Sequence, residues 1–138
     1  MGTTSPKPGR ALRIPGARRV GKREAPVVVD PGMTQRDLHS EFLRADLFLN
    51  MGQPTEAARI LQAVVEAEPA NEGALELLAR AYFASAQLGR AEASLIRLVE
   101  LAPANGWARR ALARTLERQS RSAEATPHHR VADALGGA

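Results

Sequence analysis

The chain of 138 residues contains no cysteine. This absence excludes disulfide bonds, zinc sites with thiolate ligands, iron–sulfur clusters and a cysteine nucleophile. The chain also has no apolar run near the roughly 20 residues that a helix needs to span a bilayer. No hydrophobic stretch follows the basic N-terminus, as it would in a secretory signal. We therefore expect a soluble cytoplasmic protein.

Patterns typical of a catalytic site are also missing. The sequence contains no glycine-rich loop that would cradle a phosphate, no nucleophile–base pair and no paired inward-facing carboxylates. His128 and His129 are adjacent, so on a helix their side chains point about 100° apart, and no acid cluster supplies a further metal ligand. The sequence predicts a protein that is not an enzyme and needs no cofactor or metal.

Charge is distributed unevenly along the chain, although the net charge is only +4. Residues 1–26 carry seven basic residues and one acidic residue, whereas residues 27–105 carry six arginines and eleven acidic residues. Residues 106–138 are basic again, with six arginines and three acidic residues. Segregation of charge by segment favours interaction with a partner over simple solubility.

The N-terminal segment is poor in apolar side chains and rich in residues that break helices. Four prolines and four glycines interrupt residues 1–26, and the only sizeable apolar side chains there are Leu12, Ile14 and Val20. Such a segment buries too little surface to offset an ordering cost of about 1–2 kcal/mol per residue. We expect residues 1–33 to form a disordered basic arm with its lead-in, followed by a folded domain over residues 34–138.

Three roles remain open for this arm: an inert leader, a segment that docks on an acidic protein, and an electrostatic contact to nucleic acid such as ribosomal RNA. The arm has no aromatic residue for base stacking. Any binding to nucleic acid would therefore be unspecific and strongly dependent on salt. Its basic residues are Lys7, Arg10, Arg13, Arg18, Arg19, Lys22 and Arg23.

Beyond the arm, residues of the same type recur at a spacing of 34, which is typical of a repeat made of two antiparallel helices. The recurring pairs are Ala57 and Ala91, Pro69 and Pro103, and Asn71 and Asn105, and Ala125 extends the alanine series.

Capping residues and breaks in the periodicity predict five helices and a short sixth one. The expected helices are one capped by Thr34 with Asp37 and ended at Gly52, one opened by Pro54 and ended by Pro69, one capped by Asn71, one from about Arg90 to Leu101, one capped by Asn105, and a short, weak one over about 127–135.

These residues resemble the tetratricopeptide repeat family, which has a small residue where the two helices cross and large apolar residues around it. The second unit carries the resemblance through Leu75, Leu78, Ala79, Tyr82, Ala91, Leu95 and Pro103. The resemblance implies an all-α protein, an α-α superhelix of about two and a half to three helix-turn-helix units. The units are residues 38–71, 72–105 and 106–138, the last a degenerate C-terminal cap.

The resemblance also implies that the first helix of each unit lines a concave groove, whose C-terminal end is basic. We expect an acidic peptide or a terminal carboxylate to bind arginines there, with the tryptophan as an aromatic anchor. The alternative is a solvated charged face, with the tryptophan covering a helix end. The candidate partner-binding residues are Arg80, Trp107, Arg110, Arg114 and Arg118.

A well-known subset of this family binds the C-terminal carboxylate of chaperones through lysine, asparagine and arginine side chains. The corresponding positions here hold Phe42, Asp46, Leu77, Trp107 and Ala111, so that clamp is absent. The sequence therefore predicts a protein-protein interaction adaptor or scaffold with an unidentified partner. The alternative is a nucleic-acid- or ribosome-associated factor tethered by the basic arm.

Overall fold

The computed structural model describes residues 34–136, so the predictions made for the basic arm lie outside the described residues. The contacts of the chain divide it into two units, with the boundary between Met33 and Thr34. Within residues 34–136 the secondary structure is entirely helical. The helices are α1 (Gln35–Asn50), α2 (Pro54–Ala67), α3 (Glu72–Ala84), α4 (Leu88–Leu101), α5 (Gly106–Arg118) and α6 (Ser122–Ala134).

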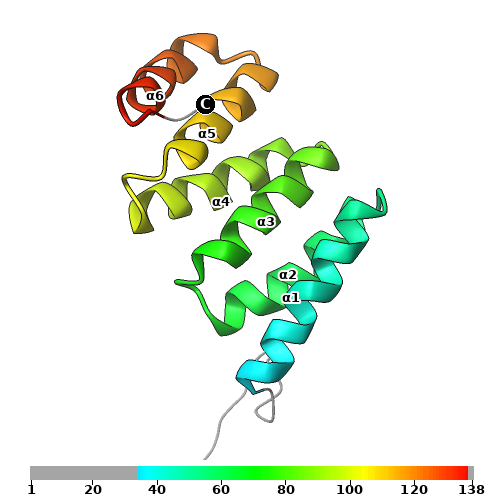
Figure 1. The fold of residues 1–138 in the computed structure, drawn as a ribbon. Coiled ribbons are helices and arrows are strands. Elements are labelled where there is room, and N and C mark those ends of the chain that lie inside the picture. The colour runs from blue at the N-terminus through cyan, green and yellow to red at the C-terminus, as the bar shows by residue number, and fades with distance from the viewer. Residues whose placement is uncertain (1–33, 137–138) are drawn as a thin grey trace, which may run out of the picture. The chain divides into compact units, whose positions relative to one another are not determined.

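The helices pack in order along the chain, each against the next (Figure 1). The pairs α1–α2, α3–α4 and α5–α6 are hairpins with short turns, and the second helix of each pair packs against the first helix of the next. α1 also touches α3. The domain is therefore an all-α stack of three helix-turn-helix units, as the sequence predicted.

Local capping chemistry fixes where the helices begin. Thr34 accepts a hydrogen bond from the backbone N–H of Asp37, and the Asp37 carboxylate accepts one from the backbone N–H of Thr34. The side chains of Asn71 and Asn105 cap α3 and α5, and Pro54 occupies the first turn of α2. These groups satisfy backbone donors that a helix start leaves without partners, which confirms the capping predictions.

The turn inside each hairpin uses the same backbone conformation. Gly52, Ala86 and Ser120, each 34 residues from the next, have φ angles of 77°, 61° and 61°. A left-handed residue ends the first helix and redirects the chain into the second. The 34-residue repeat therefore includes the backbone conformation of the turns.

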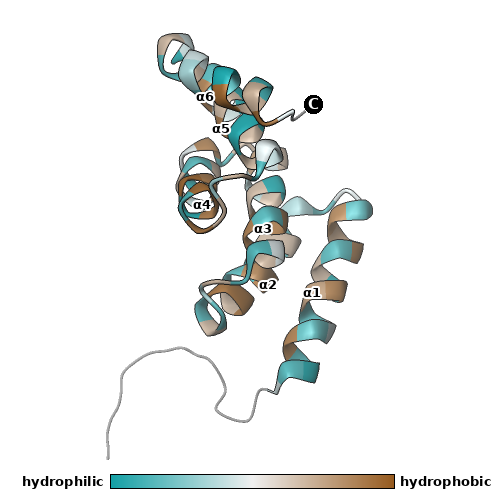
Figure 2. Cartoon of the chain, turned by 60° about the vertical axis from the view of Figure 1, so that its left-hand side comes forward, coloured by the Kyte–Doolittle hydropathy of each residue, from teal (hydrophilic) through white to brown (hydrophobic). Residues whose placement is uncertain are grey.

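The core consists of small residues where helices cross and large apolar residues around them. Hydrophobic and hydrophilic residues alternate along the helices, so each offers an apolar side to its neighbours (Figure 2). Ala57 and Ala91 are fully buried, which allows the paired helices to approach closely. The largest fully buried side chains are Leu61, Leu95, Leu98, Val64 and Thr115.

The prediction for the last helix was wrong in its position and length. α6 begins at Ser122 and includes Pro127, instead of starting near residue 127. Proline removes one backbone donor, and Pro127 is the sixth residue of α6, but it is exposed, and the burial of Ala125 and Ala132 holds α6 in place. α4 likewise begins at Leu88, two residues before the predicted start.

Candidate partner-binding groove

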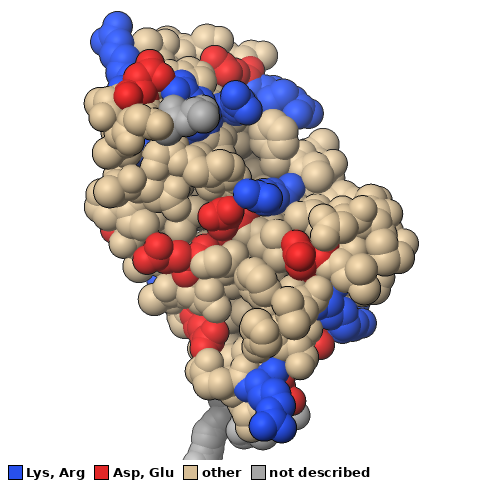
Figure 3. Space-filling model, viewed as in Figure 1, with Lys and Arg blue, Asp and Glu red and all other residues tan. Residues whose placement is uncertain are grey.

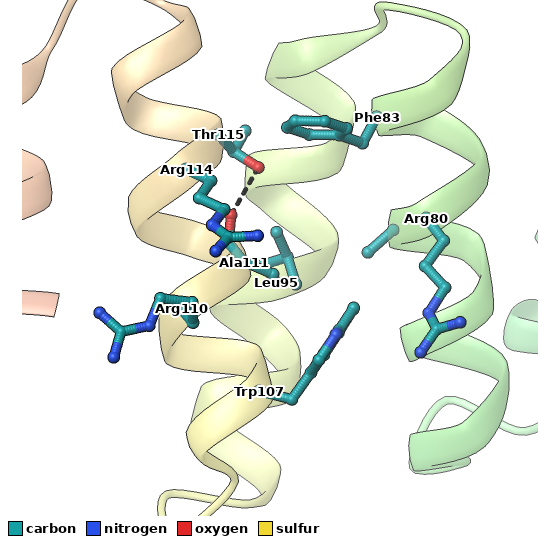
Figure 4. A pocket seen from close by; sticks show the side chains of 9 residues that line it. Arg80, Phe83, Leu95, Trp107, Arg110, Ala111, Arg114 and Thr115 are labelled. Atoms are coloured by element: carbon teal, nitrogen blue, oxygen red, sulfur yellow. Dashed lines mark hydrogen bonds between the residues drawn. The ribbon is translucent and has the colours of Figure 1, made fainter. Parts of the chain in front are cut away.

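A pocket of about 240 Å³ opens between α3 and α5, with α4 behind it (Figure 4). Its inner lining is apolar, whereas three arginines lie around it. This combination can accept an apolar group and an anionic group side by side. The lining residues are Ala79, Arg80, Phe83, Leu95, Trp107, Arg110, Ala111, Arg114 and Thr115.

One cause of this pocket is a small residue at a repeat position that holds a larger residue in the preceding unit. Ala111 stands 34 residues after Leu77, at the same position of its unit. Leu77 is buried in the cluster between the first two units, whereas the shorter Ala111 leaves room between α3 and α5. A difference of one side chain between equivalent positions thus opens space at the second junction.

Two arginine–aromatic contacts connect α3 with α5. The guanidinium carbon of Arg80 lies 5.0 Å from the centroid of the Trp107 ring, and that of Arg118 lies 5.0 Å from the centroid of the Phe83 ring. Arg80 also forms an ion pair of 3.0 Å with Glu76. In the first contact α3 supplies the arginine and α5 the ring, and in the second the roles of the helices are exchanged. Each contact contributes about 0.5–1 kcal/mol at an exposed site. They fix two aromatic rings beside the pocket.

Arg110 contributes its stem to the pocket lining but its charge to another site. Its Nη1 lies 2.7 Å from Nδ1 of His129, and its Nη2 donates to Oδ1 of Asp133. Both partners are on α6, and Figure 4 shows the guanidinium pointing away from Trp107. The sequence grouped Arg110 with the groove arginines, but its charged group binds α6 instead.

Arg114 differs from its neighbours. It lines the pocket from α5 (Figure 4), and its side chain is exposed. Within residues 34–136 it has neither an ion pair nor a side-chain hydrogen bond. Basic side chains gather over α5 and α6 on this face (Figure 3). Arg114 is therefore the arginine whose charge is available at the pocket.

The sequence analysis considered His128 and His129 as metal ligands and missed their contacts between α5 and α6. Nη1 of Arg109 lies 3.2 Å from Nδ1 of His128. Nε2 of His129 lies 3.0 Å from Oε2 of Glu117 while its Nδ1 faces Arg110. Arginine can only donate, so in these contacts both Nδ1 atoms are acceptors and unprotonated. The available signal was the register, because His129 is equivalent to the buried Leu95.

These contacts predict that acid weakens the domain. Burial lowers the pKa of His128, and the positive charge of Arg109 lowers it further. The unfolded chain therefore binds a proton more readily once the pH falls below the ordinary histidine value near 6.5, and the free energy of unfolding decreases from there downward. We expect urea unfolding at pH 7.5 and pH 5.5 to show this loss, with a smaller loss in His128→Gln.

His39→Gln is the matched control, because His39 is exposed on α1. Carboxylates with lowered pKa, such as Asp133 and Glu92, act at lower pH, so they do not contribute to this interval. Equal acid sensitivity of His128→Gln and the parent protein would contradict the assignment to His128.

In the part of the chain that the structure describes, no group of three histidine, cysteine or acidic side chains is arranged to hold a metal ion. None of the helices in residues 34–136 has the length and apolar character needed to cross a membrane.

The fold and groove define a helical repeat protein, in which stacked hairpins offer the first helices of the second and third units as one surface. Residues 48–105 match the family model described as tetratricopeptide repeat. The resemblance stated from the sequence is confirmed. No match to a curated protein was found.

Solved structures of MamA share the fold. MamA AMB-1 superposes with a TM-score of 0.70 at 25% identity, covering 72% of this chain and 59% of that one. MamA from Desulfovibrio magneticus RS-1 gives a TM-score of 0.69 at 25% identity, covering 72% of this chain and 56% of that one. A mutant form of MamA gives a TM-score of 0.69 at 25% identity and covers 72% of both chains. The chain thus spans less than two thirds of the first two structures.

Proposed function

We propose that the protein is a non-catalytic adaptor that binds a segment of a partner protein in the groove between α3 and α5. The observation that carries this proposal is the pocket, which combines an apolar lining with two fixed aromatic rings and Arg114, which has no ion pair within residues 34–136. Aromatic residues and arginine are enriched among residues that dominate binding energy at protein interfaces. Similarity to MamA supports an interaction module, and no partner is carried over from it.

Charge indicates the kind of partner. Arg80, Arg114 and Arg118 lie on the facing sides of α3 and α5, and of these only Arg80 has a carboxylate partner within residues 34–136, Glu76. An acidic segment would complement this surface and associate faster at low salt. The affinity for such a partner should decrease as ionic strength rises.

The proposal predicts where the partner makes contact. A photo-cross-linking amino acid at Ala84, an exposed position of α3 next to Phe83, is expected to join the protein to its partner in extracts of the native organism. The same amino acid at Ala93, exposed on α4 and absent from the pocket lining, is the matched control and is expected to give little product. Mass spectrometry identifies the product.

Equal cross-linking from Ala84 and Ala93 would contradict the groove. The alternative function, binding of nucleic acid or the ribosome through the basic arm, concerns residues outside the described part of the chain. That alternative stays a prediction from sequence, as does the cytoplasmic location.

A further inference from the structure

We propose that the α3–α5 pocket binds one apolar side chain of a peptide and that Arg114 binds the carboxylate of the residue next to it. This inference rests on the proposed function and specifies its ligand. The partner segment would thus carry an aliphatic or aromatic residue beside an aspartate or glutamate.

The size and lining of the pocket determine the first half of this motif. Its inner surface is formed by Ala79, Leu95 and Ala111, with Trp107 and Phe83 at its sides. A volume of about 240 Å³ is large enough for a large apolar side chain. A polar group there would lose hydrogen bonds to water, because the inner residues offer only apolar side-chain atoms.

The charges around the pocket determine the second half. Arg80 is paired with Glu76 and stacked on Trp107, Arg118 is stacked on Phe83, and the charged group of Arg110 contacts α6. Arg114 alone among these arginines has no such partner in residues 34–136. A carboxylate that accepts two parallel hydrogen bonds is the group that best matches its planar guanidinium.

The spacing of the two features fits neighbouring residues of a peptide. Arg114 follows Ala111 by three residues, which corresponds to about 4.5 Å along a helix. Consecutive residues of an extended chain are about 3.3–3.6 Å apart. Because successive side chains of an extended chain point to opposite faces, a bound peptide must turn locally to place one side chain in the pocket and the next residue's carboxylate at Arg114.

Other occupants fit less well. The chain's own N-terminal arm has seven basic residues and one acidic residue, so its charge would repel Arg114. A nucleobase needs free aromatic faces for stacking, but Arg80 and Arg118 already cover one face of each ring. An acidic peptide satisfies both the apolar space and the charge.

Trp107 makes the site directly observable, because it is the only tryptophan of the chain. Its fluorescence therefore reports the pocket in the full-length protein without a label. A ligand that enters the pocket is expected to change this signal with a saturating dependence on concentration.

The test begins with selection of random heptapeptides displayed on phage against the full-length chain. We expect enrichment of an acidic residue next to leucine, isoleucine, methionine or phenylalanine. The most enriched peptide is then synthesised and titrated with Trp107 fluorescence as the readout. Replacing its acid by the amide is expected to weaken binding about tenfold or more, as for the loss of a hydrogen bond to a charged group.

Two variants separate the roles of charge and space. The Arg114→Gln variant is expected to bind the acidic peptide more weakly than the parent does, by the same factor. Its affinities for the acidic and the amide peptide are expected to be equal. Ala111→Leu introduces the side chain found at the equivalent Leu77. Because this side chain fills the pocket, the variant is expected to bind both peptides more weakly. Arg97→Gln, an exposed arginine on α4, is the matched control and should bind as the parent does.

Selected peptides without an acid, unchanged binding in Arg114→Gln, or no change of Trp107 fluorescence would each overturn the inference. The same holds if a short oligonucleotide displaces the peptide and changes the Trp107 signal at a lower concentration than the peptide does. If Ala84 still cross-links to a partner while the peptides need no acid, only the ligand class is wrong. If Ala84 and Ala93 also cross-link equally, the groove function fails as well.

Discussion

Leu95→Ala is expected to lower the free energy of unfolding by about 2–5 kcal/mol, the largest effect of any single substitution considered for this domain. Leu95 is only 1% exposed and belongs to the cluster that joins α3, α4 and α5. Truncation removes its contacts and leaves a cavity, because helices on both sides limit collapse. Urea denaturation of the purified protein measures the change.

The neighbouring Ile96 supplies the control for this result. Ile96 is on the same helix but 42% exposed, so Ile96→Ala removes similar atoms without opening a buried cavity. We expect its effect to be much smaller. Similar losses in Leu95→Ala and Ile96→Ala would show that α4 contributes little to the core.

Ala91→Leu is expected to destabilise the domain by about 1–3 kcal/mol through overpacking. Ala91 is 0% exposed and lies in the cluster that contains Leu78 and Tyr82 of the paired helix α3. A leucine there would force α3 and α4 apart or displace these side chains. The measurement is the thermal midpoint and the urea-unfolding free energy of the variant.

Ala93→Leu is the matched control, since Ala93 is exposed on the same helix. The control is expected to melt within a few degrees of the parent protein. If Ala91→Leu melts no lower than Ala93→Leu, close approach of the helices at residue 91 is not required for the fold.

The fold was predictable because its determinants are local and repeated. Thr34, Asn71 and Asn105 cap helices through side chains only three residues from the groups they bind. The start of the last helix was mispredicted because the rule that proline disfavours a helix considers only local residues. The stability of α6 depends instead on contacts with distant parts of the chain. Arg121, just before α6, pairs with Glu92 of α4 as well as with Glu124, and this contact across 29 residues has no signature in the sequence.

The sequence predicted which residues lie near one another at the site, but not the directions of their side chains. The register placed Arg80, Trp107 and Arg114 on facing helices, and the structure lines one pocket with them. The direction of the Arg110 guanidinium depends on His129 and Asp133 of α6, which lie 19 and 23 residues away. Side-chain direction follows from partners that tertiary packing supplies, so sequence spacing alone could not give it.

The three hairpin turns differ in one respect that bears on the groove. Gly52 adopts its left-handed conformation freely, whereas Ala86 and Ser120 carry a Cβ atom in the same conformation, which costs roughly 1–2 kcal/mol per residue. Both strained turns belong to the units whose first helices form the groove. The turns that lower the stability of the domain are therefore the two in the units that form the proposed groove, and the hairpin without such a penalty is the one farthest from the pocket in sequence.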